Sequence, residues 1–110
     1  MTSESEIQAD ILEYLAKAIP GHVGFFYRTE PAGAGGWHRS HKRDRGMPDI
    51  TGCYRGYWIG IEVKNDTGKL RDSQIAFRDN ISKAYGFYVV CRSVDDVIAA
   101  LKRVDERIKE

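Results

Sequence analysis

The stretch from residue 46 to residue 64 decides the fold, and it reads GMPDITGCYRGYWIGIEVK. Apolar and aromatic runs flank Arg55-Gly56, which predicts a β-hairpin that turns at this dipeptide. Counting outward from the turn pairs Asp49 with Glu62, and directly opposed residues of an antiparallel pair point to the same face of the sheet. Pro48 cannot donate a hydrogen bond to the ladder, so we expect the pairing to fray beside Asp49.

The alternation of side chains along the second strand separates two faces. Lys64 falls on the same face as Glu62, whereas Ile59, Ile61 and Val63 point to the other face and into a core. Two carboxylates and one ammonium group therefore converge at the end of the hairpin. This arrangement is typical of a metal site with a cationic helper, or else of a surface charge cluster.

Length and composition indicate a single folded domain over residues 1–110. The formal net charge of +1 neither favours nor excludes a nucleic-acid partner. Cys53 and Cys91 lack metal-ligand spacing, and we expect both to be reduced residues in or near the core. No apolar run is long enough to span a bilayer and no signal peptide opens the chain, so we expect a cytoplasmic, intracellular protein without a membrane partner.

The remaining elements follow from hydrophobic periodicity. An amphipathic helix is predicted over residues 3–19, with an apolar stripe formed by Ile7, Ile11, Leu15 and Ala18. Further elements are a strand over 22–29, a helix over 70–84, a strand over 87–91 and a final helix that begins after Ser93. The strand over 87–91 is almost continuously apolar, which favours an interior position in the sheet. The predicted order is α-β-β-β-α-β-α.

Two polar residues occur on apolar stripes. Glu4 lies on the inward side of the first helix, whereas Glu6 lies on its polar side and forms a capping box with Ser3. Glu4 is therefore either aimed inward or a solvated residue of a helix end. Gln74 lies on the apolar stripe of the helix over 70–84, either as a core amide bonded to backbone or as a group that reaches the carboxylates.

A long loop rich in glycine and basic residues is predicted over residues 30–47. Its segment 36–46 carries four basic residues against Asp44 alone, and Trp37 lies among them. Stacking on an aromatic ring combined with phosphate contacts is typical of nucleic-acid binding, although a solvated loop without a role has the same composition. The candidate DNA-binding residues are Arg28, Trp37, Arg39, Lys42, Arg43 and Arg45.

The converging charges suit the hydrolysis of a phosphodiester. Mg²⁺ held by carboxylates neutralises the phosphate and activates water, and it needs only two or three protein ligands. Asp49 and Glu62 fit this role, Glu4 could complete it, and the Val63 carbonyl is adjacent. Lys64 would hold the water or stabilise the phosphate. Zn²⁺ suits the chain less well, because its three histidines show no spacing relation to the acids.

The chain also resembles a known family. Pro48-Asp49 followed by Glu62-Val63-Lys64 resembles the signature of the PD-(D/E)xK nuclease superfamily, and the wider pattern resembles its VRR-NUC branch, the virus-type replication-repair nucleases. The features that carry the resemblance run from residue 4 to about residue 98. They are Glu4-xxx-Gln8, Gly46-Met47-Pro48-Asp49, Ile61-Glu62-Val63-Lys64, the Gly68-Lys69 turn and Gln74.

The resemblance implies a fold and a set of roles. The fold is an α/β, restriction-endonuclease-like core whose mixed central sheet is flanked by helices. The implied metal ligands are Glu4, Asp49, Glu62 and the Val63 carbonyl. Lys64 would be the catalytic lysine, and Gln74 would be a motif residue that supports the site.

The implied function is a Mg²⁺-dependent DNA endonuclease in which Mn²⁺ substitutes for Mg²⁺. Stand-alone members of this branch resemble Holliday-junction resolvases, which act as homodimers on branched DNA in repair or recombination, and a phage origin would suit the resemblance. Flap or nicking activity stays open. The alternatives are a non-catalytic nucleic-acid-binding or assembly module that retains the fold, and a metal-dependent enzyme acting on another phosphate ester.

Overall fold

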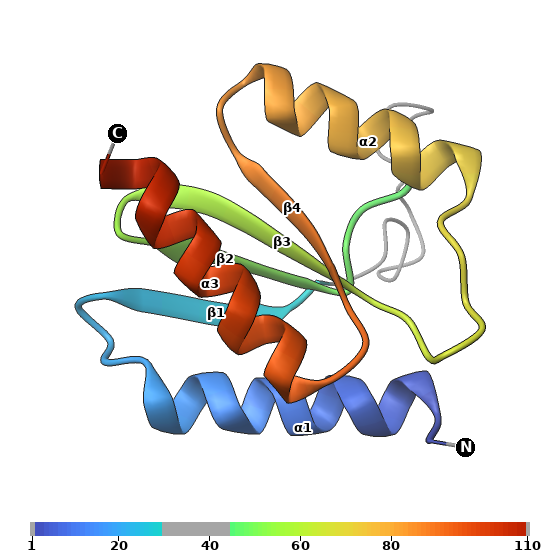
Figure 1. The fold of residues 1–110 in the computed structure, drawn as a ribbon, viewed down its shortest axis with the longest axis horizontal. Coiled ribbons are helices and arrows are strands. Elements are labelled where there is room, and N and C mark those ends of the chain that lie inside the picture. The colour runs from blue at the N-terminus through green and yellow to red at the C-terminus, as the bar shows by residue number, and fades with distance from the viewer. Residues whose placement is uncertain (1, 30–44, 110) are drawn as a thin grey trace, which may run out of the picture.

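Three helices and a four-stranded sheet make up the fold in a computed structural model that describes residues 2–29 and 45–109 (Figure 1). The sheet order is β1-β2-β3-β4, with antiparallel pairing throughout except between β3 and β4, which are parallel. The predicted element order and the mixed sheet are thus confirmed. The elements are α1 Glu4–Ala18, β1 Gly24–Arg28, β2 Ile50–Tyr54, β3 Tyr57–Val63, α2 Asp72–Lys83, β4 Phe87–Cys91 and α3 Val94–Lys109.

The central hairpin has the predicted register. Its ladder runs from Tyr54 opposite Tyr57 to Ile50 opposite Ile61. Arg55 and Gly56 form the turn with φ angles of 51° and 86°. A two-residue turn in which both central residues have positive φ matches the right-handed twist of the strands that it joins.

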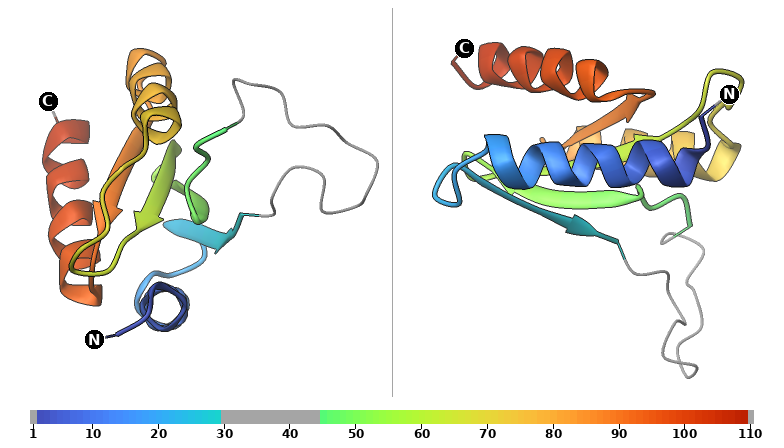
Figure 2. Two further views of the ribbon diagram at one scale, coloured as in Figure 1. Left: turned by 90° about the vertical axis from the view of Figure 1, so that its right-hand side faces the viewer. Right: turned by 90° about the horizontal axis from the view of Figure 1, so that it is seen from below.

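Helices cover both faces of the sheet (Figure 2). Helices α1 and α3 pack on the face that holds the hydrophobic core, and α2 packs on the opposite face over β4. Burial of each core aliphatic side chain contributes roughly 1.5–3 kcal/mol. The buried core residues are Ile7, Ile11, Leu15, Ile50, Tyr54, Ile59, Ile61, Val63, Cys91, Val97, Ala100, Leu101 and Val104.

Some positional expectations are wrong. The strand over 87–91 is the last in the sheet order and not an interior strand. It is apolar on both faces because α2 and α3 pack on it from opposite sides. Cys53 is exposed because it points to the face away from the core, whereas Cys91 is buried as expected. Ala18 is exposed in the last turn of α1.

No helix in the described part of the chain combines the length and the hydropathy that a bilayer span requires.

Candidate active site

Glu62, near the end of β3, is the centre of a buried polar cluster. Its Oε2 accepts a hydrogen bond of 2.8 Å from Gln74 Nε2 and lies 3.3 Å from Lys64 Nζ. All three residues are buried, with exposed fractions of 4% for Glu62, 8% for Lys64 and 2% for Gln74. The second oxygen, Oε1, is also buried but has no hydrogen-bond partner among the described residues. Such an oxygen loses its hydration without compensation, at a cost of about 1–3 kcal/mol.

Asp49 is held where the hairpin ladder stops. The last pair is Ile50 opposite Ile61, and beyond it the Val63 N–H donates to Asp49 Oδ2 at 2.8 Å. The Asp49 carbonyl accepts from the Thr29 N–H at 2.9 Å. The Asp49 carboxylate therefore takes the place of a backbone carbonyl as the acceptor for β3, while the Asp49 backbone carbonyl continues the pairing with β1. Fraying beside a proline is thus what turns the Asp49 carboxylate toward β3.

Gln74 uses both ends of its amide. Its Oε1 accepts from the Arg71 N–H at 2.8 Å, just before α2 begins, and its Nε2 donates to Glu62. The structure thus shows both of the roles expected for this residue, a buried amide bonded to backbone and a group that reaches the carboxylates. A glutamate at this position would set a second carboxylate against Glu62, so the amide is the side chain that satisfies both partners.

The segment before Asp49 is clamped between α2 and β4. Gly46 has a φ of +86°, and a Cβ at this position would lie 2.2 Å from the Ser73 carbonyl oxygen. A side chain at Gly46 would therefore push the segment away from the first turn of α2. On the other side, the Tyr88 hydroxyl donates to the Gly46 carbonyl at 3.1 Å.

Two supporting residues escaped the sequence analysis. One is Tyr88; the other is Arg92, whose guanidinium donates to the Asn65 carbonyl and, at 2.9 Å, to the Gly68 carbonyl. These bonds hold the turn that follows β3. A single tyrosine in an apolar strand, or a single arginine after one, carries no sequence signal of a partner more than twenty residues away.

Of the two N-terminal glutamates, Glu4 lies closer to the cluster. Its Oε2 accepts from the Asn65 N–H at 3.2 Å. A Cβ at Gly68 would lie 3.0 Å from Glu4 Oε2 and 3.1 Å from Lys64 Cδ, so the two side chains flank this glycine. Glu6 instead exchanges hydrogen bonds with Ser3 at the start of α1. Glu4 is exposed, so it borders the cluster from the solvent side.

The electrostatics of the cluster favour a cation. Burial, and next the nearby Asp49 carboxylate, raise the pKa of Glu62 to about 7, although Lys64 acts in the opposite direction. Burial also raises the pKa of Tyr88, and the charge of Glu62 adds to this effect. The ionised form of Glu62 therefore has too little stabilisation from the residues around it.

A Mg²⁺ ion would suit this deficit. Mg²⁺ prefers oxygen ligands and is commonly bound by one or two carboxylates together with water. Asp49 and Glu62 could supply the carboxylates, and the buried Glu62 Oε1 lacks a partner in the described residues. Over residues 2–29 and 45–109, no three His, Cys, Asp or Glu side chains are close enough to surround one ion. Glu4 and the Val63 carbonyl as additional ligands stay predictions.

The candidate DNA-binding residues divide into two groups. Arg28 at the end of β1 and Arg45 before the clamped segment are both exposed. The other four, Trp37, Arg39, Lys42 and Arg43, lie outside the described residues.

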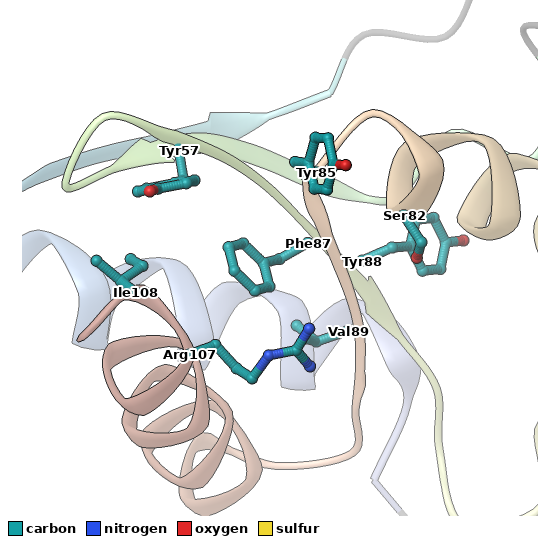
Figure 3. A pocket seen from close by; sticks show the side chains of 9 residues that line it. Tyr57, Ser82, Tyr85, Phe87, Tyr88, Val89, Arg107 and Ile108 are labelled. Atoms are coloured by element: carbon teal, nitrogen blue, oxygen red, sulfur yellow. The ribbon is translucent and has the colours of Figure 1, made fainter. Parts of the chain in front are cut away.

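A pocket of about 440 Å³ lies at the opposite end of β3 and β4 from this cluster. Figure 3 shows Phe87 in its middle, with Tyr57 and Ile108 nearby and Arg107 extending from α3 across Val89. No carboxylate among the described residues lines it. The polar cluster around Glu62 therefore lies outside this pocket.

No family model and no curated protein matches the chain. A solved structure described as a VRR_NUC domain protein superimposes on it with a TM-score of 0.69, over 94% of this chain and 88% of that chain, at 18% sequence identity. The chain has the VRR-NUC fold. The fold that the motif resemblance implied is thereby confirmed. In this VRR-NUC fold the clustered residues are the same ones that carry the resemblance, namely Asp49, Glu62, Lys64 and Gln74.

Proposed function

We propose that this chain is a metal-dependent endonuclease that hydrolyses phosphodiester bonds in branched or distorted DNA. The VRR-NUC fold favours a nuclease. The observation that supports the chemistry is the polar cluster at the end of β3. There the Lys64 ammonium lies 3.3 Å from the Glu62 carboxylate, and Glu62 Oε1 is buried without a partner in the described residues.

Asp49 and Glu62 would hold the Mg²⁺ ion, for which Mn²⁺ would substitute. Glu4 and the Val63 carbonyl would complete the ligand set. When bound, the ion supplies neutralising charge at the phosphate and lowers the pKa of water. The hydrogen bond from Gln74 keeps the Glu62 carboxylate in one orientation, and the Val63 N–H does the same for Asp49.

Lys64 would stabilise the negative charge that grows on the phosphate. Water attacks the phosphorus, the bond to one bridging oxygen breaks, and the products are a phosphate monoester and an alcohol. Because Lys64 is buried, its charge is weakly screened by solvent, and its position beside Glu62 is set before the substrate arrives. Removal of one such stabilising group typically lowers kcat about 10²–10³-fold.

The substrate would be bound chiefly through its phosphates. Arg28 and Arg45 are exposed on the described surface, and the sequence between them supplies Trp37, Arg39, Lys42 and Arg43. Phosphate contacts position a protein on DNA without reading its sequence, which suits recognition of DNA shape. A homodimer would bring a second site to the second strand of a junction.

The test is cleavage of an end-labelled four-way junction, a flap and a nicked duplex, each with Mg²⁺, with Mn²⁺ and with EDTA. We expect cutting that requires metal and falls about 10²–10³-fold in Lys64→Ala. The matched control is Lys102→Ala, which removes an exposed lysine of α3 and should leave cutting unchanged. Tight binding without cutting in either metal would instead support the non-catalytic binding module.

A further inference from the structure

Two aromatic rings of β1 face solvent. Phe25 is 68% exposed and Tyr27 is 50% exposed, and their ring centroids lie 6.1 Å apart with an angle of 34° between the planes. The residue between them, Phe26, packs against the core on the other face. Exposed large apolar side chains that form a contiguous patch often mark a binding surface.

These two rings lie on the sheet face that carries the candidate active site. Phe25 is opposite Cys53 and Tyr27 is opposite Thr51, and on β3 the same rows continue to Trp58 and Gly60. Opposed residues share a face, and on β3 this face continues to Glu62 and Lys64. The aromatic pair and the polar cluster are thus two parts of one surface.

Helix α2 covers only one part of this surface. The α2 residue Phe77 has its ring 6.3 Å from that of Trp58 on β3 and 6.0 Å from that of Tyr88 on β4. Figure 2 shows α2 on the β4 side of the sheet and β1 at the far edge. Within residues 2–29 and 45–109, no helix packs on this face of β1, where the two rings stand open to solvent.

The aromatic pair is close to the cluster. Two strand spacings across the sheet and two residues along β3 separate Tyr27 from Glu62, which corresponds to about 12 Å between their Cα atoms. A hydrogen bond also links β1 to the cluster: the N–H of Thr29, two residues after Tyr27, donates to the Asp49 carbonyl at 2.9 Å. The hydroxyls of Thr29 and Thr51 share a hydrogen bond of 2.6 Å.

We propose that Phe25 and Tyr27 form a platform on which unpaired bases of DNA stack beside the phosphodiester that is cut. This inference rests on the proposed function and specifies its substrate, a branch point with unpaired nucleotides. Stacking on aromatic side chains tolerates any base, because every base has a π face. The exposed cations Arg28 and Arg45 provide the charge that phosphates require.

A protein partner fits this surface less well. A stable protein interface buries about 800 Å² on each partner, whereas these two partly exposed aromatic side chains supply at most about 300 Å². Nucleic acid needs no comparable apolar area, because phosphate contacts provide much of its affinity. The experiments below nevertheless distinguish DNA from a second copy of the chain bound to this face.

The first experiment measures binding without cutting. Phe25→Thr/Tyr27→Thr is made in the Lys64→Ala background, because threonine preserves strand propensity at these positions. The probes are a fluorescent fork with single-stranded arms and a blunt duplex of equal paired length. We expect the dissociation constant for the fork to rise at least about fivefold and that for the duplex to stay unchanged.

The matched control is Tyr85→Ala, which removes an aromatic ring that is 84% exposed in the turn between α2 and β4. It should change binding of neither probe, and Phe25→Trp/Tyr27→Trp should restore binding of the fork. Equal weakening of both probes, or no weakening of the fork, would overturn the platform.

The second experiment uses Cys53 as a reporter. It is exposed and lies opposite Phe25, whereas the other cysteine, Cys91, is buried and has its pKa raised to about 12. Alkylation by a maleimide should therefore occur at Cys53, and saturating fork should slow it several-fold while duplex should not. Slowing that depends on protein concentration without DNA would assign the face to a second copy and overturn the proposal.

The two proposals can fail separately. Both binding experiments use the Lys64→Ala protein, so neither requires cleavage. If the wild-type protein cuts no substrate but the threonine variant loses binding of the fork, the platform proposal holds and the nuclease proposal fails. If the wild-type protein cuts junctions while the threonine variant binds forks normally, the nuclease proposal holds and the platform proposal fails.

Discussion

The end of strand β3, together with Lys64 after it, has two buried faces of opposite chemistry. Ile59, Ile61 and Val63 point into the core with exposed fractions of 0–1%, whereas Glu62 and Lys64 lie on the other face at 4% and 8%. Water is excluded from both. On the apolar face burial removes hydrocarbon from water and stabilises the fold. On the polar face burial removes charge from water and costs free energy unless partners compensate.

The compensation on the polar face is incomplete. Gln74 and Lys64 both interact with Glu62 Oε2, while Oε1 has no partner among the described residues. The apolar face thus stabilises a strand whose other face is strained electrostatically. Such a division is expected where a site must hold a charge ready for a ligand. Substitutions on the two faces of β3 should therefore affect stability and chemistry separately.

The largest effect is expected from Ile61→Ala on the apolar face. Ile61 is 1% exposed in the centre of the core, and its truncation leaves a cavity between α1, α3 and the sheet. The free energy of unfolding should fall by about 2–5 kcal/mol. Urea denaturation followed by circular dichroism measures this loss.

The control is Ile108→Ala, which truncates a half-buried isoleucine at the end of α3 and should cost much less. At temperatures where Ile61→Ala remains folded, its metal-dependent cutting should equal that of the wild type. A loss of cutting in the folded variant would instead show that the two faces of β3 are energetically coupled.

A smaller effect of opposite sign is expected from Glu62→Gln on the polar face. Burial raises the pKa of Glu62 to about 7 from its ordinary value of 4.5. The folded state therefore binds this proton more tightly than the unfolded state, and stability falls as the pH rises from about 4.5 to about 7. The neutral amide avoids this loss. In EDTA at pH 8, the variant should be more stable than wild type by roughly 1–3 kcal/mol.

The measurement is the free energy of unfolding of both proteins in EDTA at pH 5 and at pH 8. At pH 5 the difference should be much smaller than at pH 8, because wild-type Glu62 is then largely protonated in the folded state and only part of the loss has occurred. Glu106→Gln, at an exposed position of α3, should show no such pH dependence. A destabilised variant at pH 8 would mean that the Lys64 ion pair outweighs the desolvation of Glu62.

The parts of the site that sequence could predict follow from local geometry. The turn at Arg55-Gly56 determines every pair of the hairpin, so the convergence of Glu62 with Lys64 follows from the period of two along a strand. Gln74 was found because a polar residue on the apolar stripe of a helix must have a buried partner.

The parts that sequence could not predict depend on packing between distant elements. The hydrophobic pattern of a strand shows that both of its faces are covered but not whether helices or strands lie beside it. The pattern therefore wrongly predicts an interior position for β4, which is the last strand of the sheet. Cys53 is expected in or near the core because it lies in a strand, but its side chain points to the face away from the core and is exposed. The bond from Tyr88 to Gly46 needs the crossover through α2 to bring β4 against the segment before Asp49.

The smallest effects on stability are expected from Glu4→Gln and Glu6→Gln. Comparing these two variants tests which glutamate borders the polar cluster. Both residues are exposed in the first turn of α1, so each change should alter the free energy of unfolding by only about 0.5 kcal/mol. Their effects on cutting should differ. Glu4 accepts from Asn65 and flanks Gly68 together with Lys64, whereas Glu6 is bonded to Ser3.

Initial rates of junction cutting over a Mg²⁺ titration separate the two glutamates. For Glu4→Gln we expect the Mg²⁺ concentration at half-maximal rate to rise about tenfold or more, since losing even a partner that only orients a ligand commonly lowers metal affinity 10–100-fold. For Glu6→Gln we expect no change. The reverse result would place Glu6 at the site and require α1 to turn relative to β3. An unchanged Mg²⁺ requirement in both variants would remove α1 from the ligand set, because Asp49 and Glu62 would then bind the ion without its help.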